Sequence, residues 1–224
     1  MMIKHYLKVA FRNLAKYKVQ SIVSILGLAV GFVCFALSTL WIRYEMTYDT
    51  FHEGAERIYL VRAHYAHEPG KISNSTPYPL ADYLQKGNPE IEAMASTSVQ
   101  KVKFRVKDTE KDVVSAAADS VLMNFFNIRV LRGTVNFLKG TNGEIAITEE
   151  FSKRIFGEEE ALGREVEVSG HASKVGAIVS GWSSHSNIPY SILTSARHYT
   201  QWGSANENLF VRIRKGTNGE EFQK

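Results

Sequence analysis

The sequence of 224 residues has almost no cysteine. Its one cysteine, Cys34, lies inside a long apolar run. Residues 43–224 therefore have no cysteine with which to form a disulfide, and a hydrophobic core must stabilise them instead. A region of this length is large enough to bury such a core, in one or two lobes.

Charge is absent from Ser21 to Ile42, a run of 22 residues that is flanked by Lys18 and Arg43. At about 1.5 Å per residue, a helix of this length reaches roughly 33 Å, enough to cross a hydrocarbon core of about 30 Å. A signal peptide usually has an apolar region of about 7–15 residues followed by small residues at the cleavage site. We therefore predict a transmembrane helix over residues 20–42, in preference to a signal peptide or a buried core helix.

Acidic residues are absent from residues 1–19, which carry five bases. The remaining residues, 20–224, have 22 bases and 23 acids, so the overall net charge of +4 belongs to the N-terminal segment. The positive-inside rule places this segment in the cytoplasm and residues 43–224 outside the membrane. A nucleic-acid-binding protein would carry its excess of bases on the folded domain, so no nucleic-acid partner is expected.

Two patterns in the N-terminal part indicate contacts with lipid and with other helices. Bases recur every four residues over residues 4–16, which predicts an amphipathic helix on the inner membrane surface within residues 1–19. A solvated basic tail is the alternative. Gly27 and Gly31 form a small-xxx-small pair, which predicts either a face for close helix packing or an incidental pair of glycines.

Recognisable catalytic and ligand-binding motifs are missing. The one Gly-Lys pair, Gly70-Lys71, lacks the other residues of a phosphate-binding loop. His64 and His67 have no further metal ligand at a recognisable spacing. The serine-rich residues 183–186 lack the motif of a nucleophile, and the acidic cluster 158–160 is typical of a solvated turn. We therefore predict no catalytic, cofactor or metal site, and no enzyme.

Residues 43–224 alternate between strand and helix patterns, which predicts an α+β fold. We expect the membrane helix to continue to about Ala55, a helix capped by Thr76 and Pro77, and a second helix capped by Thr148 and ended by Gly157. The strand over residues 102–106 has a cationic face. We interpret it as an edge strand protected by lysines, with anion binding as the alternative. Further strands are expected near residues 57–64, 112–118, 144–148 and 209–214, with a hairpin of 164–168 and 174–179.

The order of these segments resembles bacterial ABC transporter permeases of the MacB/FtsX type. The resemblance begins with LKVAFRNLAKYK (residues 7–18), SILGLAVGF (24–32) and YEMTYDTFHEGAERIYLVR (44–62). It continues with AADSVLMNFFNIRVLRG (117–133), IAITEEFSKRIFGEEEALGREVEV (145–168) and SHSNIPYSIL (184–193). The residues similar to the first segment of the family's periplasmic core domain are Tyr48, Asp49, Phe51, His52, Arg57, Ile58 and Tyr59.

This resemblance implies the N-terminal part of a non-catalytic permease in the bacterial inner membrane. Its periplasmic domain, residues 43–224, would couple the motion of a separate cytoplasmic ABC ATPase to export or extraction. The resemblance also implies a permease dimer, a periplasmic partner and no cofactor. Family permeases return to the membrane for at least three further spans, so we expect a fragment or a degenerate subunit. The alternatives are a single-pass membrane-anchored sensor or binding ectodomain and, more remotely, a membrane-anchored hydrolase.

Overall fold

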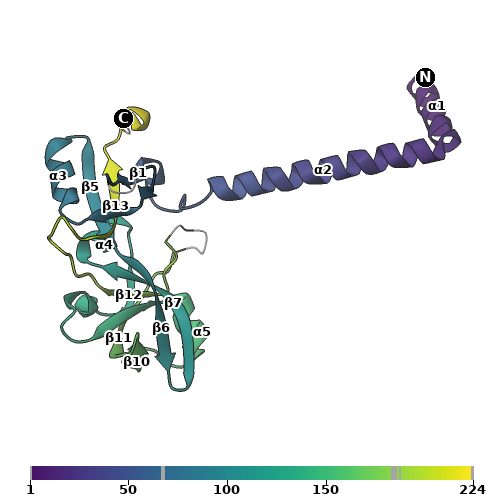
Figure 1. Cartoon of the computed structure of the whole chain (residues 1–224). Helices are drawn as coiled ribbons and strands as arrows, with labels where there is room; N and C mark the ends of the chain where they lie inside the picture. Colours follow the sequence, from purple (N-terminus) through teal and green to yellow (C-terminus); the bar gives the residue numbers. More distant parts are fainter. Residues whose placement is uncertain (1, 67–68, 183–185, 187, 223–224) are drawn as a thin grey trace. The chain divides into compact units, whose positions relative to one another are not determined.

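The computed structural model describes residues 2–66, 69–182, 186 and 188–222, and only the backbone of residues 3, 4, 7, 10, 11 and 221. The chain divides into two compact units, Met1–Tyr48 and Asp49–Lys224. The first unit is helical, whereas the second is rich in strands (Figure 1). The two units are described separately below.

The first unit contains α1 (Met2–Lys16) and α2 (Lys18–Met46). Among the described residues, α2 is the only helix long and apolar enough to cross a membrane. None of its side chains is buried against the protein. A helix that is apolar all round and has no protein partner matches the prediction of a membrane span.

The predicted continuation of the membrane helix to Ala55 is wrong. The helix ends at Met46, and residues 47–50 form a turn. Asp49 has a φ of 55°, a left-handed conformation that a right-handed helix cannot contain. The next helical element is the short 3₁₀ helix η1 (Ala55–Arg57), which follows Gly54 at a φ of 72°.

The smaller sheet of the second unit is organised around its last strand, β13 (Ala205–Ile213). One edge of β13 pairs with β5 (Ile91–Thr97), and its other edge pairs with β1 (Ile58–Leu60) and β4 (Ser75–Pro77), all antiparallel. Helix α3 (Leu80–Gly87) packs beside β5. The apolar core here includes buried Ile91 and Leu209. The short strands β2 (Ala63–His64) and β3 (Ile72–Ser73) form a separate ribbon, and α6 (Gly219–Phe222) ends the described chain.

The larger sheet closes on itself. Its strands pair in the order β10, β6, β7, β12, β9 and β11, and β11 pairs back with β10. These six strands therefore form a ring, and β8 (Val130–Gly133) lies beside β11. The ring strands are β6 (Val99–Val106), β7 (Thr109–Ala118), β9 (Glu144–Thr148), β10 (Glu165–Val168), β11 (His171–Val179) and β12 (Ile192–Ser195).

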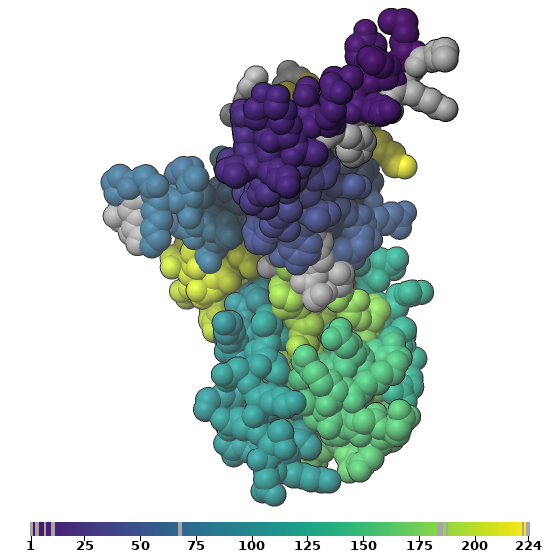
Figure 2. Space-filling view, turned by 90° about the vertical axis from the view of Figure 1, so that its right-hand side faces the viewer, coloured from purple at the N-terminus to yellow at the C-terminus, as the bar shows by residue number. Residues whose placement is uncertain are grey.

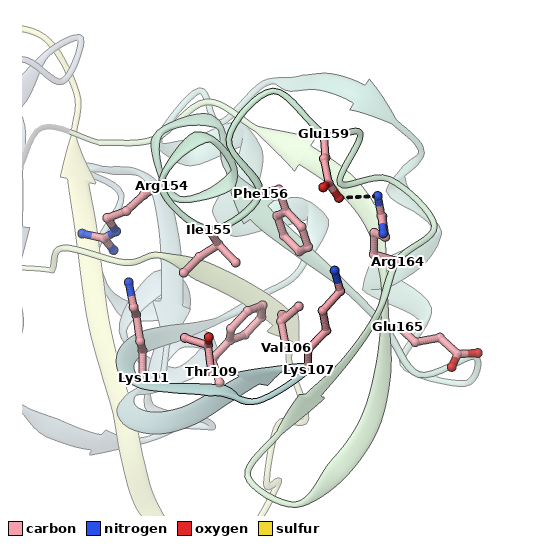
Figure 3. A pocket seen from close by; sticks show the side chains of 11 residues that line it. Val106, Lys107, Thr109, Lys111, Arg154, Ile155, Phe156, Glu159, Arg164 and Glu165 are labelled. Carbon is pink, nitrogen blue, oxygen red and sulfur yellow. Dashed lines mark hydrogen bonds and ion pairs between the residues drawn. The ribbon is translucent and has the colours of Figure 1, made fainter.

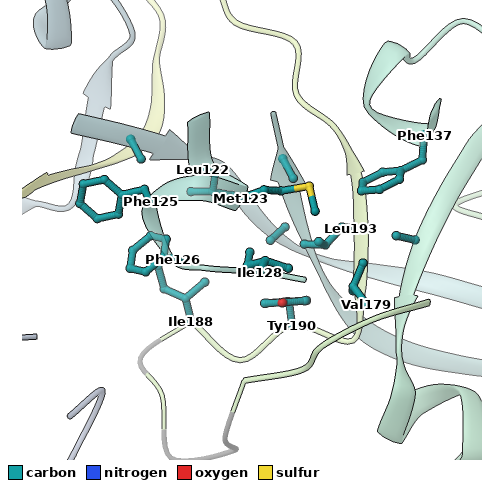
Figure 4. Close-up of a cluster of buried hydrophobic side chains, with 14 of the residues drawn as sticks. Leu122, Met123, Phe125, Phe126, Ile128, Phe137, Val179, Ile188, Tyr190 and Leu193 are labelled. Atoms are coloured by element: carbon teal, nitrogen blue, oxygen red, sulfur yellow. The ribbon is translucent and has the colours of Figure 1, made fainter. Parts of the chain in front are cut away.

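Side chains alternate between two cores along the ring strands, as the period of two in a strand requires. In β9, Ile145 and Ile147 join a core with Phe151 of α5 (Glu149–Phe156). Ala146 between them joins a second core, which also contains Phe210 of β13. Figure 4 shows this second core, to which α4 (Ser120–Phe125) contributes Leu122, Met123 and Phe125, and which η2 (Val135–Lys139) covers with Phe137. Because this core takes residues from both sheets, we call it the shared core. It joins the two lobes of the second unit, each of which is built around one sheet.

Two further expectations from the sequence are wrong. Thr76 and Pro77 do not cap a helix, because they lie in β4, where the Thr76 hydroxyl donates a hydrogen bond to the Glu207 carbonyl (3.0 Å). The lysine-rich strand β6 is not an edge strand, because it pairs with β10 and β7. Its cations are balanced across strands: Glu110 of β7 pairs with Lys103 at 2.8 Å and with Arg105 at 2.7 Å.

The helix predicted after Thr148 is confirmed at both ends. The Thr148 hydroxyl accepts a hydrogen bond from the backbone N–H of Phe151 (3.2 Å), and the N–H of Gly157 donates to the Lys153 carbonyl (2.9 Å). Gly157 has a φ of 61°, which glycine adopts readily at a helix end. The hairpin of β10 and β11 turns at residues 169–170, inside the predicted interval.

Candidate functional site

The segment between the membrane helix and the first strand folds back on itself. We call residues 49–59 the connecting segment. The N–H of His52 donates to the Asp49 carbonyl (3.3 Å), and the N–H of Ala55 donates to the His52 carbonyl (3.1 Å). The Asp49 carboxylate accepts a hydrogen bond from the hydroxyl of Ser186, in the stretch before β12. The turn is therefore fastened to a distant part of the second unit.

His52 lies among aromatic rings. Its ring centroid is 4.2 Å from that of Phe51, 4.9 Å from Phe126 and 4.8 Å from Trp182. Phe126 follows α4 and contacts Phe210 of β13 (5.1 Å), so the cluster continues into the shared core. Burial lowers the pKa of His52, and the positive charge of Arg212 lowers it further against the opposing effect of Asp49. A neutral imidazole fits this apolar environment.

Arg57 fastens the same segment to the smaller sheet. Its Nη1 lies 2.5 Å from Oε2 of Glu92 in β5 and donates to the carbonyl of Ile213 in β13 (2.7 Å). The arginine side chain is only 17% exposed. Gly54 makes room for it, because a Cβ there would lie 3.1 Å from Nη2 of Arg57. A charged group this buried needs such partners.

The end of the segment enters the sheet as β1. Ile58 pairs with Arg212 of β13 and packs against the shared core. Tyr59 packs instead against the apolar core of the smaller sheet, the one that contains Ile91 and Leu209, where its ring lies 6.3 Å from that of Phe222. Arg212 in turn stacks on Phe125 of α4 (4.4 Å) and donates to the Phe125 carbonyl. Six of the seven family-like residues thus make contacts within the second unit, and the seventh, Tyr48, is the last residue of the first unit.

A second histidine lies where the two sheets approach each other. His198, in the loop between β12 and β13, is 17% exposed. Its Nε2 lies 3.1 Å from the carboxylate of Asp119, which follows β7 of the ring and caps α4. Its Nδ1 lies 3.7 Å from Oε1 of Glu207 in β13, a carboxylate that is only 5% exposed. The imidazole also stacks on Tyr78, at a centroid distance of 4.0 Å and an angle of 14°.

The charges of this cluster support one another. The hydrogen bond to Asp119 and the negative charge of Glu207, 3.7 Å from Nδ1, raise the pKa of His198 to about 9. Burial by itself would raise the pKa of Asp119, but the hydrogen bonds from His198 and the Leu122 N–H outweigh it and lower that pKa. An imidazolium between two carboxylates is therefore the stable form at neutral pH. No sequence pattern pointed to these residues, because they are 79 and 9 positions apart with no common motif.

The glycine pair of the membrane helix lies on an open surface. A Cβ added at Gly27 or at Gly31 would meet no atom within 4 Å. The structure leaves room for a neighbouring helix there, and the packing role of the pair stays a prediction.

The remaining candidates for chemistry do not form a site in the described residues. Glu159 and Glu160 pair with Arg164 (2.7 Å) and Arg132 (3.0 Å), so the acidic turn holds loops together. The described residues contain no group of three histidine, cysteine or acidic side chains that could hold a metal ion. His64 is exposed in β2, whereas His67 and residues 183–185 lie outside the described residues.

Comparisons with known proteins agree on one family. The MacB-like periplasmic core domain matches residues 21–224. A domain of a putative permease protein from Porphyromonas gingivalis has the same fold, with a TM-score of 0.63 and 18% identity, over 76% of this chain and 81% of that one.

Two further solved structures share the fold. The extracellular domain of the noncanonic ABC-type transporter YknZ from Gram-positive bacteria has a TM-score of 0.53 and 16% identity, over 73% of this chain and 85% of that one. The periplasmic region of MacB from Actinobacillus actinomycetemcomitans has a TM-score of 0.51 and 11% identity, over 74% and 78%. No curated protein sequence matches the chain.

Proposed function

The chain belongs to the family of MacB-like periplasmic core domains, and we propose from this premise that it transmits motion between a membrane helix and a periplasmic domain. In this proposal α2 spans the inner membrane, the N-terminus is cytoplasmic and residues 43–224 are periplasmic. A separate cytoplasmic ABC ATPase supplies the motion, and the periplasmic domain uses it for export or extraction. The chain itself is not an enzyme.

The contacts of the connecting segment carry this proposal. His52 contacts Phe126 and Trp182, which belong to the core shared by both sheets, while Arg57 binds Glu92 and the Ile213 carbonyl of the smaller sheet. A displacement that reaches the connecting segment therefore acts on both lobes together. Contacts that are packed and hydrogen-bonded transmit displacement, whereas a flexible linker would absorb it.

Partners follow from the same proposal. The basic face of α1 binds anionic lipid, and Gly27 and Gly31 of α2 pack against further permease helices, including those of a second permease subunit. A periplasmic partner binds the outer domain. A single-pass sensor or binding ectodomain is the alternative, and it requires no ATPase.

An insertion separates these two functions. Three residues, Gly-Ser-Gly, placed between Thr47 and Tyr48 would interrupt the connection to the second unit. We expect the ABC ATPase that co-purifies with the wild-type chain from native membranes to co-purify still, with substrate-stimulated ATP turnover reduced at least about tenfold. The control carries the same insertion in the turn after Lys107 and keeps its turnover. Equal turnover in both variants would refute coupling, and the absence of any ATPase would favour the sensor.

Topology provides a second test. A periplasm-active reporter fused after Lys224 should be active in cells, and a tag at residue 2 should be labelled only after the membrane is permeabilised. A reporter active only in the cytoplasm would reverse the orientation and overturn the proposal.

A further inference from the structure

A cavity of about 410 Å³ lies in the second unit, away from the connecting segment. Its walls are the turn between β6 and β7, the C-terminal half of α5 and the loop that leads to β10 (Figure 3). These elements also lie side by side on the surface in Figure 2, the hairpin in teal and α5 with β10 in green. The volume falls in the range of about 300–1,000 Å³ that is usual for small-molecule sites.

The inner wall of the cavity is apolar. Phe104 of β6 is 1% exposed, and Val106, Ile155 and Phe156 are half-buried around it. These side chains belong to the core that also contains Ile145 and Ile147 of β9. In this core the aromatic rings of Phe104 and Phe151 make an edge-to-face contact at 5.0 Å. The wall is therefore fixed by the fold and is able to receive an apolar group without rearrangement.

The rim of the cavity carries positive charge that the protein does not neutralise. Among the described residues, no carboxylate lies within ion-pair distance of Lys107, Lys111 or Arg154. Lys111 and Arg154 point toward each other across one end of the cavity (Figure 3). Of the two acids on the rim, Glu159 is bound to Arg164 at 2.7 Å and Glu165 points outward.

This arrangement differs from that of two other cations in the same hairpin. Lys103 and Arg105 on β6 share Glu110, and Arg105 also lies 3.2 Å from Glu167. Lys103 and Arg105 are thus paired with acids. In the described part of the chain, Lys107 and Lys111 at the cavity have no acidic partner, as is also true of Lys101 at the start of β6. Two like charges that face each other repel, and an anion between them would relieve the repulsion and accept hydrogen bonds from both.

We propose that this cavity binds a small amphiphilic anion. The acidic head group, a carboxylate, sulfonate or phosphate, lies between Lys111 and Arg154, and the apolar body covers Phe104, Val106 and Phe156. Lys107 lies at the other end of the cavity, where its side chain points toward Arg164 (Figure 3). The inference does not depend on the proposed coupling function, because none of these residues belongs to the connecting segment or to the His198 cluster.

A matched set of probes tests both halves of the site. The full chain in nanodiscs of zwitterionic lipid is titrated by calorimetry with naphthalene-1-sulfonate, with empty nanodiscs as the reference. The neutral analogue naphthalene-1-methanol has the apolar body alone, and inorganic sulfate has the anion alone. We expect the sulfonate to bind at least about tenfold more tightly than either control, because one charge-assisted hydrogen bond is worth about that factor. Equal binding of the sulfonate and either control would overturn the proposal.

Substitutions locate the binding. Lys111→Gln with Arg154→Gln should weaken sulfonate binding at least about tenfold and remove its dependence on salt. The matched control, Lys101→Gln with Lys139→Gln, removes two exposed cations elsewhere and should leave the affinity unchanged. Thr109→Trp, at an exposed strand position on the rim, should block the cavity while keeping every cation. Unchanged affinity in Thr109→Trp, or equal losses in both double variants, would refute this site.

Discussion

His52 and His198 are the same side chain in opposite environments. His52 lies among three aromatic rings, and burial lowers its pKa. His198 lies between two carboxylates, which raise its pKa to about 9. The first joins the connecting segment to the shared core by packing, and the second joins the two sheets by charge. The comparison shows that one protein fastens two neighbouring junctions by different forces, which respond differently to substitution and to pH.

The largest effect is expected from the apolar junction. Phe126→Ala removes a ring that is 8% exposed and contacts His52, Trp182 and Phe210. We expect the free energy of unfolding to fall by about 3–4 kcal/mol, the usual range for a buried phenylalanine. Phe51→Ala, in which the lost ring is 44% exposed, is the control and should cost about 1 kcal/mol. Equal losses in urea unfolding would mean that the packing at His52 adds little stability.

The charged junction should lose less. His198→Gln leaves Asp119 and Glu207 without the cation between them, and we expect a loss of about 2 kcal/mol. His171→Gln, at an exposed position of β11, should change stability by less than about 0.5 kcal/mol. A second substitution, Glu207→Gln, should restore part of the loss in the His198→Gln background. If the stability losses of the two single variants simply add in the double variant, His198 and Glu207 do not stabilise each other.

The two junctions should respond to pH in opposite directions. The raised pKa of His198 adds stability that is full below about 6.5 and is lost as pH rises through about 9. The lowered pKa of His52 adds stability that is full above about 6.5 and is lost as pH falls toward its folded value. We expect the loss of stability at alkaline pH, the alkaline limb, to amount to about 1 kcal/mol after allowance for partial exposure of His198. The loss at acid pH, the acid limb, comes from His52.

Urea unfolding between pH 5 and 10 measures both limbs. The alkaline limb should flatten in His198→Gln, and the acid limb should flatten in His52→Gln. A wild-type alkaline limb in the His198→Gln variant would assign that dependence to another group.

The smallest effect on the two junctions is expected from the membrane helix. Gly27→Leu with Gly31→Leu fills an open helix face, so the free energy of unfolding of the second unit should change by less than about 0.5 kcal/mol. Assembly with the ATPase and substrate-stimulated ATP turnover should fall, because bulky side chains keep helices apart. Ala29→Leu, on another face, should leave both unchanged. Wild-type co-purification and turnover in the double variant would reduce α2 to a membrane anchor.

Local signals in the sequence predicted part of this fold. Thr148 and Gly157 act within one helix, so the ends of α5 were visible in the sequence. The strands β9 and β11 were also predicted, although β11 begins at His171, before the predicted residue 174. Contacts between distant segments decided the rest. Thr76 has the character of a helix cap, but its pairing with β13 places it in a strand. The ring closure that makes β6 an internal strand and the meeting of His198 with Asp119 both join residues far apart in the chain, so no local pattern reports them.

The place of β13 in the smaller sheet also determines when this sheet can fold during synthesis. Within the described part of the chain, β1 and β4 pair in that sheet with β13 alone, and Arg57 donates to a carbonyl 156 residues further along the chain. The membrane helix and the connecting segment leave the ribosome first, yet this hydrogen bond cannot form before Ile213 has been made. At about 5–20 residues per second, the segment waits roughly 8–30 seconds for its last partner. Throughout that interval its apolar and charged groups depend on water, lipid or a chaperone.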